Sequence, residues 1–207
     1  EEKGPRAVWA DAGAAIFLTD ISGDGLADLV RIRNGEVCYW PNLGYGRFGD
    51  KVTMDNAPWF ESPDQFNPAN IRLADIDGSG VTDIVYLGSG CAVLWFNQSG
   101  NAWSEPHKLP WSPPADSIAS ANVLDLLGSG TACLVWTSRM PGASRTAIQY
   151  INLMKEGKPH LLVSVRNNLG AETRFRYVPS TYFYLQDKSD GKPWATKLPF
   201  PVHVLER

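Results

Sequence analysis

The sequence predicts an all-β fold made of propeller-type blades, and three observations carry this prediction. A loop that begins with Asp and has Gly at its sixth place recurs three times, about 50 residues apart. Each copy is followed by short β-patterned runs separated by tight turns. The chain also holds 19 Gly and 15 Pro, which is typical of short strands and turns. A period near 50 with four strands in each unit indicates propeller blades.

The repeats fill residues 1–165, and a non-repeating tail fills residues 166–207. We place the three repeats at about 12–56, 68–110 and 119–165. In the first repeat we expect four strands, at Ala15–Thr19, Leu26–Arg33, Glu36–Trp40 and Lys51–Met54. Asn34-Gly35 is a hairpin signal because both residues tolerate positive φ. The second repeat has Ser89-Gly90 at the same place.

The third repeat is predicted to be longer and less regular. Its strands are expected at Thr131–Thr137, Thr146–Asn152 and His160–Val165, with a short insertion near Met140–Gly142. Three blades are too few to close a ring, since propellers have about 4–8. We therefore expect either further blades outside this chain or an open arc.

The first two Asp loops have oxygen-bearing side chains at alternate places, which suits a hard cation. Those candidate ligands are Asp20, Ser22, Asp24 and Asp28 in the first loop and Asp75, Asp77, Ser79 and Asp83 in the second. Ca²⁺ takes 6–8 oxygen ligands, so each loop is a candidate for a weak, structural calcium site. The twelfth places are Arg31 and Tyr86, so neither loop is an EF-hand. The alternative is that Asp and Ser only cap turns through their own backbone amides.

The third loop keeps Asp125 and Ser129 but has Leu127 and Cys133 at two other ligand places. We expect it to keep the turn and to lose the metal. Downstream, Trp40, Trp95 and Tyr150 occupy one place in the repeat when the copies are aligned by sequence. Packing between blades is the expected role of these rings, and a stacking surface for sugars is the alternative.

Composition and motifs exclude several function classes. With 43% hydrophobic and 20% charged residues the chain can build a core. A net charge of −3 without a basic run argues against nucleic acid as a partner. No apolar stretch approaches the ~18 residues of a membrane span, so we expect no membrane insertion. The chain starts without a signal peptide or an initiator Met, and we expect it to be part of something longer.

No catalytic motif is present. The three His form no metal pattern, the three Cys form no Cys-x-x-Cys pair, and neither a nucleophile elbow nor a phosphate loop occurs. We expect the cysteines to be buried thiols. The sequence therefore predicts a protein that is not an enzyme.

The Asp loops resemble the FG-GAP/VCBS repeats of integrin-like propellers. The tail contains the runs Arg166–Thr173, Tyr177–Thr181 and Gly191–Arg207. With these runs the chain resembles the B component of bacterial Tc insecticidal toxin complexes and the related plasmid virulence protein B. From the tail we expect a strand at Thr173–Val178 and a short helix that Ser180 caps, reaching Gln186.

The resemblance implies a structural and docking role in a secreted toxin complex. In that family the B and C components form a hollow shell around a toxic effector, and the B propeller docks on the pore-forming A component. The implied partners are therefore the A and C components, and the implied location is extracellular, after a stage in the bacterial cytoplasm. A calcium-dependent carbohydrate-binding or adhesive propeller is the alternative function.

Overall fold

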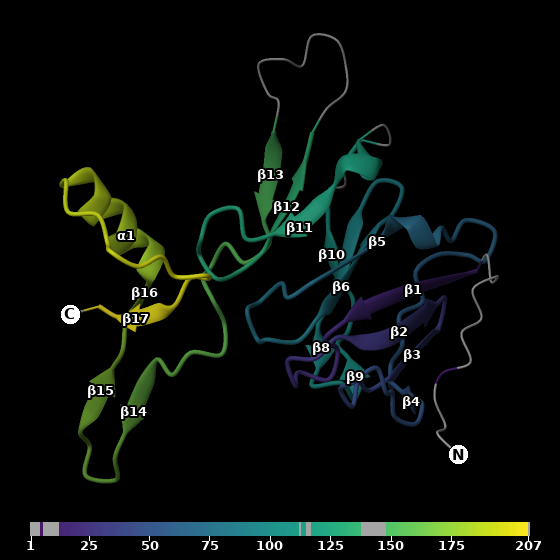
Figure 1. Cartoon of the computed structure of the whole chain (residues 1–207), viewed down its shortest axis with the longest axis horizontal. Helices are drawn as coiled ribbons and strands as arrows, with labels where there is room; N and C mark the ends of the chain where they lie inside the picture. The colour runs from purple at the N-terminus through teal and green to yellow at the C-terminus, as the bar shows by residue number, and fades with distance from the viewer. Residues whose placement is uncertain (1–4, 6–12, 112, 115–116, 138–147, 207) are drawn as a thin grey trace.

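A computed structural model describes residues 5, 13–111, 113–114, 117–137 and 148–206. Three antiparallel sheets follow one another along the chain, and the tail forms a separate group of short hairpins and one helix (Figure 1). The all-β prediction is confirmed. No helix of the described residues is both long and apolar enough to cross a bilayer.

The first sheet has the order β1-β2-β3-β4. Its strands are β1 (Ala14–Thr19), β2 (Asp28–Arg33), β3 (Glu36–Trp40) and β4 (Val52–Thr53). All four lie where the sequence predicts them. Gly35 has φ +77°, as the predicted two-residue turn between β2 and β3 requires. The Asn34 side chain also fixes the next connector, because its Oδ1 accepts the Phe60 N–H at 2.7 Å.

The second sheet repeats this plan with one addition. Its strands are β5 (Ile71–Ala74), β6 (Asp83–Leu87), β7 (Ala92–Trp95) and β10 (His107–Leu109). A small hairpin, β8 (Asn97–Gln98) with β9 (Ala102–Trp103), lies between β7 and β10 in sequence. A 3-10 turn, η1 (Pro68–Asn70), precedes β5 and is capped by the Asn67 side chain.

The third sheet consists of three strands in the described part of the chain. They are β11 (Asn122–Leu124), β12 (Cys133–Trp136) and β13 (Gln149–Asn152), preceded by the 3-10 turn η2 (Ile118–Ser120). The prediction of a last strand in this repeat, at His160–Val165, is wrong, since these residues are mostly irregular. Its last two residues belong to β14, which pairs in the tail and not with β13. The insertion near Met140–Gly142 lies outside the described residues.

The third sheet also differs in register. Leu29 faces Trp40 in the first sheet and Ile84 faces Trp95 in the second, but the equivalent Leu134 faces Ile151. Ile151, not Tyr150, therefore occupies the Trp place of the repeat. A shift of one residue turns each side chain to the opposite face of a strand. Tyr150 is accordingly half exposed, which corrects the sequence alignment of this position.

Two apolar cores lie between successive sheets. The first core joins Val30, Ile32 and Tyr39 of the first sheet to Ile84 and Trp95 of the second. The second core joins the outer face of the second sheet, with Val85, Leu87 and Leu94, to Leu134 and Trp136 of the third. The second sheet thus buries both faces, and the first and third sheets each bury one face against it. We call these contacts the first and second blade junctions.

The tail holds two small hairpins and a helix. β14 (Ser164–Arg166) pairs with β15 (Glu172–Arg174), and β16 (Tyr177–Pro179) pairs with β17 (His203–Leu205) around α1 (Ser180–Ser189). Ser180 is the first helical residue and does not cap the helix, contrary to the prediction. Its hydroxyl instead accepts the Val202 N–H at 3.0 Å, which ties the helix to β17.

Candidate functional site

The first Asp loop is held by its own backbone amides. Asp20 accepts N–H groups from Gly23 at 2.7 Å and Gly25 at 2.8 Å, one on each carboxylate oxygen. Asp24 accepts the Leu26 N–H at 2.8 Å. These are the local bonds by which Asp stabilises a tight turn. The turn-building role that the sequence suggests for this loop is therefore present.

Asp28, the ninth residue of the loop, is fully buried and fastens the loop to the end of β3. Its Oδ2 accepts the amides of Ile21 and Ser22, and its Oδ1 accepts the Asn42 amide at 2.9 Å. A buried carboxylate needs such partners, since a charge without them is costly in an apolar interior. Asp28 therefore acts as a bracket between two segments of one blade.

The second loop repeats the arrangement almost bond for bond. Asp75 accepts the amides of Gly78, Ser79 and Gly80. Asp83 is fully buried and accepts the amides of Ile76 at 2.9 Å and Asn97 at 2.8 Å.

The loops also join the blades to each other. The Thr82 N–H donates to the Asp20 carbonyl at 3.0 Å, and the Ala132 N–H donates to the Ile76 carbonyl at 2.9 Å. Asn97 Nδ2 bridges the first junction by donating to the Ile21 and Thr82 carbonyls. The sequence shows that Asn recurs after the Trp place, but the bridging contact depends on the packing of two blades.

The third loop keeps the turn but not the bracket. Asp125 accepts the amides of Ser129 at 3.0 Å and Gly130 at 2.7 Å. Cys133 stands where Asp28 and Asp83 stand in the other copies, and it is fully buried. Burial raises the pKa of the Cys133 thiol, so the thiol stays neutral there. The retained turn agrees with the sequence prediction.

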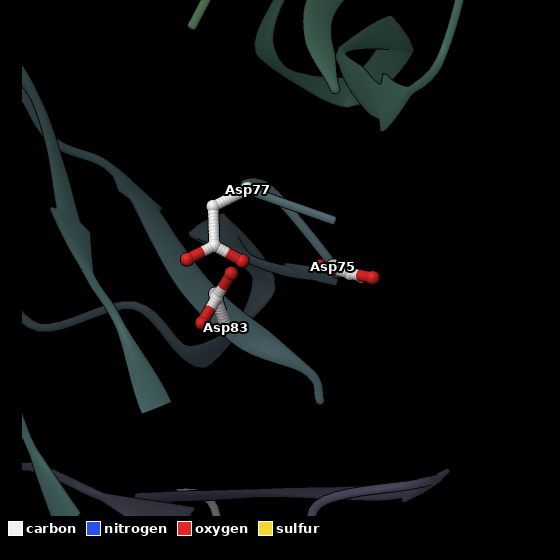
Figure 2. Close-up of side chains that lie close together, drawn as sticks. All are labelled: Asp75, Asp77 and Asp83. Atoms are coloured by element: carbon white, nitrogen blue, oxygen red, sulfur yellow. The ribbon is translucent and has the colours of Figure 1, made fainter. Parts of the chain in front are cut away.

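Three carboxylates of the second loop gather in one place. Asp75, Asp77 and Asp83 each offer an oxygen within 4.8 Å of the others, and Asp77 and Asp83 face each other (Figure 2). In the described ranges no second group of three such ligands forms. Of the ligands predicted in the first loop, the carboxylates Asp20, Asp24 and Asp28 thus do not form such a group.

The electrostatics of this cluster are uneven. Burial raises the pKa of Asp83 to about 7, and it also raises the pKa of Asp75. Burial opposes ionisation of Asp77 as well, but hydrogen bonds from Ser79 and His160 outweigh it and lower the pKa of Asp77. His160 Nε2 lies 3.1 Å from Asp77 Oδ2 and is a partner that no local sequence signal indicated. The cluster is therefore an acidic site in which the His160 ring bonds one of the three carboxylates.

The donor set of the second loop fits a hard cation. All three groups are carboxylates, and each keeps lone pairs beyond those that the backbone amides use. A bound cation would also place a positive charge beside the buried Asp83 carboxylate, whose hydrogen-bond partners are neutral backbone amides. Asp75, Asp77 and Asp83 would hold the ion, while the Ser79 amide already bonds Asp77 at 2.9 Å.

The aromatic residues mostly pack, as expected. Trp95, Trp103 and Trp136 are at most 4% exposed, and Trp40 is half-buried beneath the Arg31 guanidinium. Among the Trp residues that the structure describes, Trp59 is the exposed one, at 65%. Trp9 lies outside the described residues. Among the described rings considered for sugar stacking, Trp59 and the half-exposed Tyr150 are therefore the accessible ones.

Two family models match the chain. Residues 97–207 match the insecticide toxin TcdB middle/N-terminal region, and residues 20–86 match an FG-GAP-like repeat. The chain belongs to the insecticide toxin TcdB middle/N-terminal family. The resemblance seen in the Asp loops and the tail is thus confirmed. No curated protein matches the chain.

Solved toxin structures share this fold. TcdB2-TccC3 without its hypervariable C-terminal region is 31% identical over 95% of this chain, with a TM-score of 0.79. The Photorhabdus luminescens Tc holotoxin pore is 31% identical over 95%, with a TM-score of 0.78. The chain spans only about 9% of the length of either of these chains.

Proposed function

We propose that this chain is a non-catalytic structural segment of a secreted Tc-type toxin complex. The observation that carries the proposal is the match over 95% of the chain to TcdB2-TccC3 and to a Tc holotoxin pore. The fold is consistent with this role, because the carboxylates of the Asp loops accept hydrogen bonds from backbone amides and so hold the blades together. The implied partners are a C component and a pore-forming A component.

The two parts of the chain have different tasks in this proposal. The blades present a rigid surface for the junction with the pore-forming component. The tail contributes to the effector-enclosing shell, since Leu169, Phe200 and Leu205 are each more than half exposed. Exposed apolar groups gathered in one segment are typical of a surface that another part of an assembly covers.

The test uses the intact toxin subunit co-expressed with its C component. Leu205→Asp places a charge on the exposed face of β17 and should make the enclosed effector sensitive to added protease. Tyr45→Asp, at a fully exposed residue of the first blade, is the matched control and should leave the effector protected. An effector that stays protected in the Leu205→Asp subunit contradicts the role of the tail in the shell.

The junction with the pore-forming component needs its own measurement. The intact subunit should bind that component in size-exclusion chromatography, and the isolated 207-residue chain should compete when added in excess. Loss of competition by a folded chain argues against a docking role for the blades.

We further propose that Ca²⁺ binds the second Asp loop as a weak structural ion. Calorimetry should detect binding in the range of 10⁻⁴–10⁻³ M that extracellular modules show. Asp75→Ala should abolish it, and Asp20→Ala, the matched change in the first loop, should not. Binding that survives Asp75→Ala, or heat that is absent in the unsubstituted chain, contradicts the proposal.

A further inference from the structure

The second blade junction contains a groove. Its volume is about 1120 Å³. The second sheet lines it with Leu94, Phe96 and Leu109, and the segment after β13 lines it with Leu153 and Met154. Half of its sixteen lining residues are apolar and half are polar or charged, and it is large enough for several residues of an extended chain.

At the first junction, a hairpin and a tryptophan fill the corresponding space. There the hairpin β8–β9 packs over the first Asp loop, and Trp103 is 1% exposed in the core. The backbone of Asp55 holds the hairpin by bonds to Asn101 and Trp103. Gly100 lets the hairpin approach closely, because a Cβ there would lie 2.9 Å from the Tyr39 hydroxyl.

The described part of the third repeat has no equivalent of this hairpin with its buried tryptophan. Trp103 follows Trp95 by eight residues, and the same count from Ile151 ends at Pro159. Pro159 lines the groove and does not fill it. By this count the third repeat has Pro159, and no large aromatic residue, at the position of Trp103.

The outer edge of the same blade is also incomplete. β4 pairs with β3 in the first sheet and β10 pairs with β7 in the second, but within the described residues β13 has no strand on its outer side. An open strand edge presents unpaired amide and carbonyl groups. The open edge and the groove lie next to each other, because the segment that leaves β13 lines the groove.

We propose that a strand from the same toxin polypeptide, outside residues 1–207, completes the third blade by pairing with β13 and inserting a large apolar side chain into the groove. The matched toxin chains are far longer than this one, which spans about 9% of them. The other blades of the chain are likewise completed by their own polypeptide. The mode is strand addition at a sheet edge, with a pocket for one side chain. This inference deepens the proposed structural role, on which it rests.

The test is photo-crosslinking in the intact subunit. His107, an exposed residue that lines the groove, is replaced by p-benzoylphenylalanine, and Tyr45 carries the same group in the control. After irradiation, peptide mass spectrometry should find residue 107 joined to one extended, apolar segment outside residues 1–207. Met154→Trp, which fills the groove from within, should reduce the adduct at least ~10-fold while the melting temperature of the subunit is retained.

Several outcomes overturn the inference. They are no adduct at residue 107, an adduct within residues 1–207, an adduct with a second copy or another protein, and an adduct that Met154→Trp leaves unchanged. Effector protection is measured on the same samples. A subunit that protects its effector but gives no adduct refutes the completed blade and leaves the proposed function standing.

Discussion

The two blade junctions are built from the same repeat but are closed in different ways. The first junction is sealed by an internal hairpin, with Trp103 in the core and Asn97 bridging two blades. The second has Pro159 where Trp103 would be, keeps an open groove, and reaches the neighbouring loop through His160. Repetition of a loop therefore sets the position of each blade but not how well its junction is filled.

The three Asp loops also differ in the residue at their ninth place. The first two end in a buried carboxylate that holds amides from two segments, and the third ends in the Cys133 thiol. The buried carboxylate bracket is kept in the first and middle blades and is lost in the last blade.

The largest expected effect comes from emptying the first junction. Trp103→Ala should lower the free energy of unfolding by ~3–5 kcal/mol, because it removes a fully buried ring and leaves a cavity. Pro159→Ala, the matched change at the second junction, should cost less than ~1 kcal/mol. Chemical denaturation of the chain measures both. Equal losses would show that the two junctions are not filled differently.

Removing a bracket should have the next largest effect. Asp83→Ala leaves the buried amides of Ile76 and Asn97 without an acceptor and should cost ~2–4 kcal/mol. Cys133→Ala at the same place of the third loop removes one sulfur and should cost ~1 kcal/mol or less. Hydrogen exchange of the Ile76 amide should speed up only in the Asp83 variant. An unchanged exchange rate there would contradict the bracket role.

The buried charge of Asp83 should make stability depend on pH. Its pKa of about 7 in the folded chain lies above the ordinary 3.8, so the folded state binds the proton more tightly than the unfolded state. Stability should therefore fall as pH rises from about 4 to about 7, by on the order of 4 kcal/mol, and level off above. Denaturation in a metal-free buffer at several pH values measures this. Asp83→Asn should flatten the profile, and a profile unaffected by that change would assign the dependence elsewhere.

The contact that replaces the hairpin at the second junction should matter least. His160 is mostly exposed, so its pair with Asp77 should contribute less than ~1 kcal/mol. His160→Ala should therefore lower the free energy of unfolding only slightly in chemical denaturation. Trp103→Ala, measured alongside, gives the scale. A loss near that of Trp103→Ala would mean that His160 seals the second junction after all.

Sequence patterns were most informative where the determining contacts are local. The first two blades and the retained third turn follow from Asp bonding its own loop amides, Gly at positive φ, and alternating apolar residues. The same reasoning placed the helix but gave Ser180 the wrong task, since Val202, which binds its hydroxyl, comes 22 residues later. It also placed Tyr150 one residue out of register. Tyr150 lies two residues before an Asn, as Trp40 and Trp95 do, so the sequences align at this position although the strand pairing does not.

By itself, the sequence determined the repeat, its strands and turns, the Asp loops and the family to which the chain belongs. All of these depend on residues close together in the chain or on runs that can be compared directly. Only the tertiary structure decided that Asp75, Asp77 and Asp83 converge while the first loop does not, that Asn97 and His160 reach across blades, and that one junction is open. The convergence depends on how one loop folds, and the other features depend on groups from separate blades, whose meeting is fixed by packing and register.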